Sequence, residues 1–169
     1  THGHEDHVGA IPYLLREFRA PVYGTRLTLG LVESKLQEFG VKNADLREVS
    51  AGEKFSFGGF NVEFINVNHS IPGAVAVALR TSAGLFVFSG DYKVDLTPIE
   101  GEPIDLGRLA ALGEEGVLAY FGDSTNSERP GYVPSERVVG ETLNEVFRSV
   151  EGRIIVASFA SHIHRIQQV

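Results

Sequence analysis

The sequence contains no cysteine, so the chain can form no disulfide bond and can offer no thiolate to a metal ion. A metal site would have to be built from histidine, aspartate or glutamate, and the lack of disulfides fits a cytoplasmic protein. Methionine is also absent, even at the first position, and no apolar run is long enough to cross a membrane. Because the chain opens directly on a histidine-rich pattern, without a leading strand, we interpret it as an internal fragment of a longer protein.

Positive charge is scarce as well. The formal net charge is −7, which by itself argues against a nucleic-acid partner, although bound divalent cations would offset part of it locally. The length of 169 residues suits one domain of ordinary size, or one domain and part of a second. We expect no association with a membrane.

The first seven residues concentrate side chains that bind metals. They place three imidazoles and a carboxylate within six positions: His2, His4, Asp6 and His7. These groups suit zinc, with manganese and iron as close alternatives. A lone histidine is more often structural than a ligand, but four such groups at this spacing favour metal binding. In an extended segment alternate side chains point the same way, so His2, His4 and Asp6 can converge.

The periodicity of the apolar residues predicts an α/β fold. Helices are expected over residues 8–18, 25–40, 104–112, 134–152 and 162–169. Strands are expected over residues 20–24, 46–49, 55–57, 62–67, 74–79, 85–88, 117–121 and 153–157. The strands at 74–79 and 117–121 are apolar enough to be buried. Breaker residues at 128–131 predict a domain boundary that divides the chain into residues 1–130 and 131–169.

Polar residues stand at the ends of three predicted strands. His69 follows the strand at 62–67, Asp91 follows 85–88, and Asp123 follows 117–121. Taken singly, His69 can be a turn residue and Asp91 the start of an Asx turn. Together with the first motif they predict a two-metal ligand set: His2, His4 and His69 for one ion, Asp6 and His7 for a second, and Asp91 as the bridging carboxylate.

Two divalent ions about 4 Å apart can share a bridging hydroxide and clamp a phosphodiester or a carbonyl group. This hydroxide would be the nucleophile, because metals lower the pKa of bound water to about 7. Asp6 can also orient it, and Asp123 is a candidate hydrogen-bond acceptor for His2 or His4. Such a centre needs roughly seven ligands. Six are present, and we expect the seventh beyond Val169.

The segment Ser158–His162 is predicted to turn from a strand into a helix. Free backbone N–H groups at such a turn suit an anion, and Ser161, His162 and Arg165 are candidate donors. The alternative is an ordinary helix cap with an amphipathic helix behind it.

These patterns resemble a known family. The pattern His2-Gly3-His4-Glu5-Asp6-His7 resembles the signature of metallo-β-lactamase-fold hydrolases, and His69 and Asp91 fall where that superfamily keeps later ligands. The segments at 122–126, 129–131, 134–136 and 159–165 are similar to the ribonuclease J family, a β-CASP branch of the superfamily. This resemblance runs along essentially the whole chain.

The resemblance implies a partial metallo-β-lactamase αβ/βα sandwich over residues 1–130, with its first strands missing, followed by the start of an α/β β-CASP domain over 131–169. It implies a ribonuclease with 5′-to-3′ exonuclease and endonuclease activity in RNA processing and decay, preferring 5′-monophosphorylated RNA. It further implies two divalent ions, usually zinc with manganese as the alternative, and a homodimer or homotetramer of the full-length protein. Asp123 matches an acidic motif near the metals, and Ala160, Ser161 and His162 would lie on the substrate side of the cleft.

Two other functions stay open. A small-molecule hydrolase of the same fold, for a thioester, lactone or β-lactam, is favoured slightly by the acidic charge and disfavoured by the elements after Pro130. A non-catalytic structural module is the third hypothesis, since one ligand and the lead-in strands are lacking. Elemental analysis would separate this last hypothesis from the others, because a catalytic centre predicts about two ions per chain.

Overall fold

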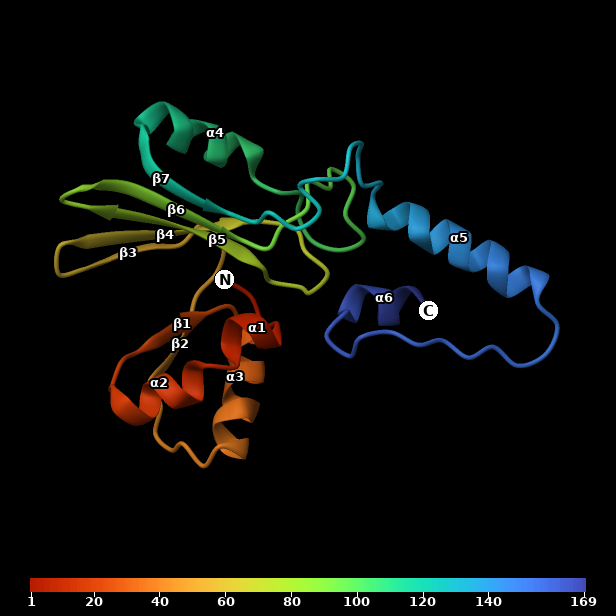
Figure 1. Ribbon diagram of the computed structural model, residues 1–169, viewed down its shortest axis with the longest axis horizontal. Helices are drawn as coiled ribbons and strands as arrows, with labels where there is room; N and C mark the ends of the chain where they lie inside the picture. The colour runs from red at the N-terminus through yellow and green to blue at the C-terminus, as the bar shows by residue number, and fades with distance from the viewer.

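A computed structural model describes residues 1–169 and shows an α/β fold built on a five-stranded sheet. In spatial order the strands are β3 (Lys54–Phe57), β4 (Phe60–Asn66), β5 (Val75–Thr81), β6 (Gly84–Gly90) and β7 (Val117–Gly122). Strands β3 to β6 are antiparallel, and β7 runs parallel to β6 (Figure 1). A second sheet pairs β1 (Val22–Gly24) with β2 (Leu46–Glu48) in parallel. The predicted fold class is confirmed.

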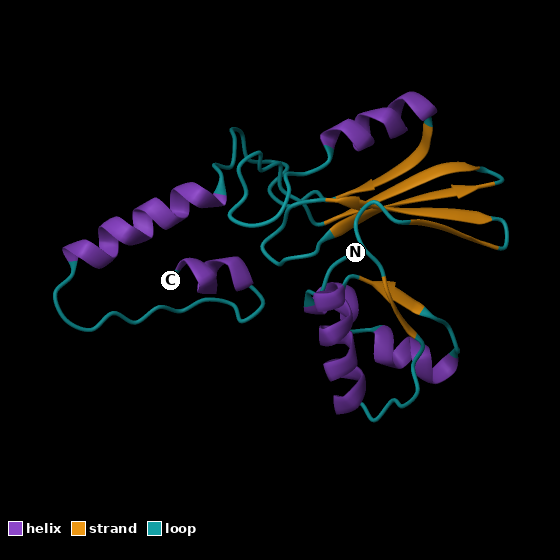
Figure 2. Cartoon of the chain, turned by 180° about the vertical axis from the view of Figure 1, so that it is seen from behind, coloured by secondary structure: helices purple, strands orange, loops and turns teal.

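The helices fall into three groups. Around β1 and β2 lie α1 (Glu5–Val8), α2 (Ile11–Glu17) and α3 (Arg26–Glu38), whereas α4 (Leu106–Glu115) lies along the five-stranded sheet beside β7 (Figure 1). The last two, α5 (Glu136–Ser149) and α6 (Ile163–Gln168), stand to one side of both sheets (Figure 2). None of the helices has the length and apolarity needed to span a bilayer. The domain boundary near residue 130 stays a prediction.

The core is divided between the two faces of the five-stranded sheet. On the face toward α4, nine buried residues pack together: Ile65, Val67, Ala74, Ala76, Ala78, Leu85, Val87, Ile104 and Leu112. On the other face, Val75 packs with Val49, Val62 and Phe64. Strand β5 therefore contributes alternate residues to both clusters. The prediction that the strand at 74–79 is buried on both faces is confirmed.

The prediction that the strand at 117–121 is buried is wrong. Strand β7 exists, but it is the edge of the sheet, and Leu118, Tyr120 and Phe121 are each more than half exposed. An apolar sequence predicts that a strand tends to be buried, but it does not say whether another element of the same chain covers it. Only part of β7 is covered, by α4.

Two further elements differ from prediction. Residues 153–157 form no strand, and Ile155 is 88% exposed, because no neighbouring strand supplies backbone hydrogen bonds. The predicted helix at 8–18 is two helices, α1 and α2, with Gly9 and Ala10 between them. Pro12 lies in the first turn of α2, where its missing N–H does not break a helical hydrogen bond.

Candidate metal centre

The segment that carries the first ligands is held between β5 and α3. The backbone N–H of Val75 donates to the carbonyl of Thr1 at 2.9 Å, so the chain enters the site beside the sheet. A Cβ at Gly3 would lie 2.5 Å from the side chain of Leu31 on α3, so glycine permits this close approach. Helix α1 then begins at Glu5, and it carries Asp6 and His7. The side chain of Glu5 points away into an ion pair with Lys35.

Three imidazoles and one carboxylate converge in a first donor group. Its members are His2, His4, His69 and Asp91. His4 Nδ1 lies 3.1 Å from His2 Nε2 and 3.0 Å from His69 Nε2. Asp91 Oδ2 lies 3.7 Å from the Nε2 atoms of both His2 and His69. The structure thus brings together residues that are up to 89 positions apart in the sequence.

A second donor group consists of Asp6, His7 and Asp91. His7 Nε2 lies 3.2 Å from Asp91 Oδ1 and 3.6 Å from Asp6 Oδ2. Asp91 therefore belongs to both groups, with Oδ2 toward the first and Oδ1 toward the second. This is the placement expected of a bridging carboxylate, and all six predicted ligands lie in these two groups.

The donor atoms of the first group fit a divalent cation. In a tetrahedral site with metal–ligand bonds of about 2.1 Å, neighbouring ligand atoms lie roughly 3.4 Å apart. The four close separations here run from 3.0 to 3.7 Å. His4 Nδ1 faces two imidazole nitrogens at once, and a single N–H can join only one such pair. A cation between them would satisfy all three nitrogens.

The electrostatics of the site also favour a cation over protonated imidazoles. Burial lowers the pKa of His2 to about 3, and the neighbouring imidazoles, His7 first, act in the same direction. Burial likewise lowers the pKa of His69, with a further contribution from His4. Neutral imidazoles keep their lone pairs free, which is the form that binds a metal.

The loops after β4 and β6 present the two distant predicted ligands, His69 and Asp91, to the cluster. The backbone N–H of Lys93 donates to the carbonyl of Asn68 at 2.7 Å, which joins the loop after Asp91 to the loop of His69. Gly90 ends β6 with a φ of +59°, and a Cβ there would lie 2.7 Å from the Thr1 side chain. Glycine thus allows the turn that aims Asp91 at the site.

Asp123 lies outside both donor groups. Its carboxylate accepts hydrogen bonds from the backbone N–H groups of Thr125, at 2.8 Å, and Tyr92, at 3.4 Å. Burial acts to raise its pKa, but these hydrogen bonds hold the pKa of Asp123 below its usual value. The prediction that Asp123 accepts a hydrogen bond from His2 or His4 is therefore wrong in this structure, because its oxygens face backbone groups.

The outer nitrogens of two predicted ligands have other partners, which the sequence did not reveal. His2 Nδ1 lies 3.2 Å from Thr1 Oγ1. His4 Nε2 lies 3.5 Å from Ser70 Oγ. Such contacts select the ring nitrogen that faces a metal. Their only signal in the sequence was adjacency, since Thr1 and Ser70 each stand next to a ligand, His2 and His69.

The three predicted substrate-binding residues precede α6. Ala160, Ser161 and His162 form a turn, and the Nε2 atom of His162 is buried without a hydrogen-bond partner. His162 and His69 both line a cavity of about 320 Å³, together with Lys93. Burial lowers the pKa of His162, and Arg165 adds to this effect. The turn thus lines the same cavity as the loop of His69, and its buried imidazole nitrogen has no hydrogen-bond partner within the chain.

One predicted donor of this turn is engaged elsewhere. The guanidinium of Arg165 donates to Glu136 at 2.9 Å and to Gln168 at 3.2 Å. Its Nε and Nη2 groups are therefore engaged within the chain, which leaves only Nη1 for an anion at the turn. Helix α6 has only six residues, so its dipole adds little to anion binding.

The fold and the donor cluster define a class of protein. The family model described as "Metallo-beta-lactamase superfamily" matches residues 1–141, and the chain belongs to this superfamily. A crystal structure of a protein of unknown function from Enterococcus faecalis has the same fold, with a TM-score of 0.64 over 88% of this chain and 38% of that one, at 16% identity.

Closer relatives are ribonucleases. Over its whole length the chain is 46% identical to ribonuclease J of Thermus thermophilus, 47% to ribonuclease J of Mycolicibacterium smegmatis, and 44% to ribonuclease J2 of Bacillus subtilis. It covers 31%, 30% and 31% of those proteins, respectively. The chain thus spans less than a third of the length of these relatives.

Proposed function

We propose that this chain is part of a metal-dependent ribonuclease that hydrolyses RNA phosphodiester bonds as a 5′-to-3′ exonuclease and an endonuclease. The observation that carries the proposal is the placement of Asp91, whose two carboxylate oxygens face two separate donor groups. A shared carboxylate of this kind suits two metal ions held side by side. The ribonuclease J relatives supply the substrate class.

Each side chain of the cluster has a proposed task. His2, His4 and His69 would hold one ion, Asp6 and His7 the second, and Asp91 both. When bound, the two ions would lower the pKa of a water molecule and act as Lewis acids toward the phosphate. Asp6 is 78% exposed at its side chain, so it can also accept a hydrogen bond from the attacking water. Zinc is the ion that the histidine-rich set favours, with manganese as the alternative.

The remaining proposals concern substrate and setting. The turn of Ala160, Ser161 and His162 would contact the RNA, preferably one with a 5′-monophosphate, and Asp123 would assist catalysis from beside the centre. The residues after 130 would begin a separate β-CASP domain. The complete protein would be a cytoplasmic homodimer or homotetramer that acts in RNA processing and decay.

The decisive experiment uses the complete protein with zinc or manganese and 5′-monophosphorylated RNA. We expect the unmodified protein to degrade the RNA and Asp6→Ala to lose about 100-fold or more in rate, since one metal loses a ligand. Asp45→Ala is the matched control, because Asp45 is an exposed carboxylate that pairs only with Arg47. Robust turnover by Asp6→Ala would overturn the proposal.

A small-molecule hydrolase is the second candidate, and one observation favours it. The cavity beside His69 carries four carboxylates, Asp95, Glu100, Glu102 and Glu136, which disfavour a polyanion. Competition separates the two functions. RNA should inhibit turnover of a reporter phosphodiester while a thioester or lactone does not; the opposite result would favour the small-molecule enzyme.

A further inference from the structure

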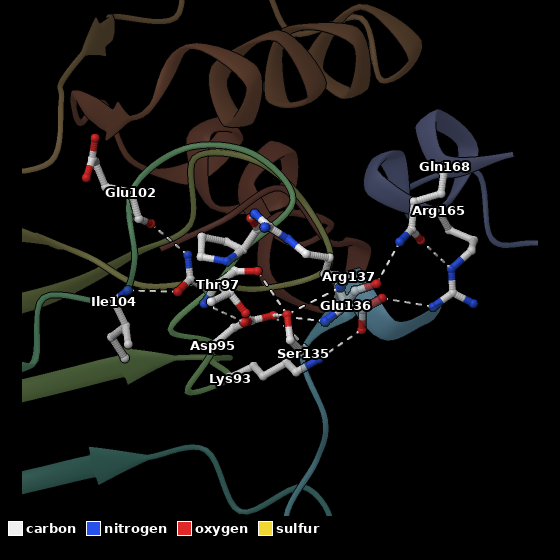
Figure 3. Close-up of polar contacts among 12 residues, drawn as sticks. Lys93, Asp95, Thr97, Glu102, Ile104, Ser135, Glu136, Arg137, Arg165 and Gln168 are labelled. Atoms are coloured by element: carbon white, nitrogen blue, oxygen red, sulfur yellow. Dashed lines mark hydrogen bonds and ion pairs between the residues drawn. The ribbon is translucent and has the colours of Figure 1, made fainter. Parts of the chain in front are cut away.

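Glu136 lies in the first turn of α5 and contacts two other parts of the chain through its side chain. One carboxylate oxygen accepts a hydrogen bond from Lys93 Nζ at 3.0 Å, and the other accepts one from Arg165 Nη2 at 2.9 Å (Figure 3). Its backbone carbonyl also accepts a hydrogen bond from Gln168 Nε2 at 2.6 Å. The side chain is 22% exposed, so these charge-assisted bonds are partly shielded from water.

One of these contacts leads to the metal centre. Lys93 lies two residues after Asp91, and its backbone N–H donates to Asn68, the residue before His69. The side chain of Asn68 is fixed in turn, because it accepts from the Ile104 N–H at 2.7 Å. The position of Lys93 is thus set by the same loops that present two of the proposed ligands.

A buried carboxylate fixes the start of α5 on the same loop. Asp95 is 3% exposed and accepts hydrogen bonds from the Glu136 N–H at 3.0 Å and from Ser135 Oγ at 3.1 Å (Figure 3). It also accepts from the Thr97 N–H at 3.0 Å. The backbone of Glu136 is therefore held firmly relative to Lys93.

The other contacts lead to α6 and the turn before it. Residues 151–169 make no backbone hydrogen bond to the rest of the chain. The two side-chain hydrogen bonds that join this segment to the rest come from Arg165 and Gln168, and both end on Glu136. Helix α6 also has no buried residue. The hydrogen bonds that hold it beside the metal loops thus end on one residue, Glu136, one at the carboxylate and one at the backbone carbonyl.

We propose that Glu136 is a positioning residue that holds the Ala160–His162 turn in register with the metal centre, through Arg165 on one side and Lys93 on the other. The inference rests on the proposed function, because the turn matters only if it contacts the substrate. Although Glu136 lines the cavity beside His69, its two carboxylate oxygens are engaged by Lys93 and Arg165, so we do not expect it to contact the RNA. Removing its charge would weaken the link to Arg165 and leave the Gln168 hydrogen bond to the backbone carbonyl, so the turn would shift while the predicted metal ligands stay in place.

The test compares isosteric variants of the complete protein loaded with metal. In Glu136→Gln only one of the two acceptor oxygens remains, no ion pair forms, and the NH2 group would face a cation. We expect KM for 5′-monophosphorylated RNA to rise about 10- to 100-fold, with kcat and metal content close to those of the unmodified protein. Glu141→Gln, on an exposed part of α5 without an ion pair, should change KM less than about twofold.

A second variant shows whether Glu136 acts through α6. Arg165→Gln should raise KM as Glu136→Gln does, and the double variant should be no worse than the poorer single variant, because both changes break one link. Arg165 is less embedded in the fold, so this variant also serves if Glu136→Gln fails to fold.

Three results would overturn the inference. In the first, KM of Glu136→Gln is no higher than KM of the control Glu141→Gln. In the second, the increases in KM caused by Glu136→Gln and by Arg165→Gln multiply in the double variant. In the third, Glu136→Gln lowers kcat and metal content and leaves KM unchanged, which would mean that Glu136 only maintains the fold or the metal centre. If the unmodified protein cleaves no RNA, the proposed function itself fails, and the inference falls with it.

Discussion

Glu63 on β4 is a buried carboxylate among three cations, and its charge should make the stability of the fold depend on pH. It is 2% exposed. Arg108 donates to it at 2.5 and 2.8 Å, Arg80 at 3.1 Å, and Lys54 lies at 3.2 Å. The hydrogen bonds from Arg108 are the main cause that lowers the pKa of Glu63 from 4.5 to about 2, and burial acts in the opposite direction. The folded chain therefore keeps this charge at a pH where the unfolded chain has lost it.

The sign and size of the effect follow from linkage. A carboxylate with a depressed pKa stabilises the fold above pH 4.5, and this contribution disappears as the pH falls toward 2. A depression from 4.5 to about 2 corresponds to about 3 kcal/mol at pH 7 and about 1 kcal/mol at pH 3. Glu63→Gln removes the titration, so the loss of stability between pH 7 and pH 3 should be about 2 kcal/mol smaller in the variant.

Urea unfolding of the metal-free complete protein, followed by circular dichroism at pH 7 and pH 3, measures this difference. Glu115→Gln is the control, because Glu115 contacts Arg80 but is 40% exposed at its side chain, and it should change stability by less than about 1 kcal/mol. The reasoning is refuted if Glu63→Gln and the unmodified protein lose stability in parallel between the two pH values.

Two predictions concern the metal centre. Asp91→Asn removes the carboxylate shared by both donor groups, so elemental analysis should show a fall from about two metal ions per chain to below one. His4→Gln is the control and should affect one ion only, because His4 belongs to one donor group. Equal losses of metal in the two variants would contradict a bridging role for Asp91. Gly90→Ala places a Cβ against Thr1 at a φ of +59°, so it should destabilise the fold by about 1–3 kcal/mol and weaken metal binding in a chelator titration. Gly58→Ala is the control, because Gly58 has a similar φ of +55° but open space around it. This variant should lose about 1 kcal/mol of folding stability and keep its metal affinity. Equal metal affinity in the two variants would contradict the steric argument.

The convergence of the predicted ligands could be foreseen because it depends on strand ends. His69 follows β4 and Asp91 follows β6, and these two strands run in the same direction on either side of β5, so their ends lie at one edge of the sheet. The spacing from His2 to His7 is local, so it needed no tertiary information. The elements themselves follow apolar periodicity, which explains why the strands from β3 to β6 match their predicted ranges within a few residues.

The misses share a different cause. The exposure of β7, the absent strand at 153–157 and the orientation of Asp123 all depend on what lies beside them in space, which periodicity does not encode. The same holds for Glu136, whose link to Lys93 joins residues 43 positions apart through ordinary charged side chains. Such ion pairs carry no spacing signature, so the sequence predicted Arg165 as an anion donor when it is bonded to Glu136.

The local origin of His2, His4, Asp6 and His7 has a consequence for folding. These four residues stay neighbours when the chain is unfolded, so an ion has partners in that state too. Folding adds His69 and Asp91, which lie 65 and 87 positions beyond His4. Ligand binding stabilises a fold only by the ratio of affinities between the folded and unfolded states. A chelator should therefore lower the unfolding temperature by less than the affinity of the folded site alone would suggest.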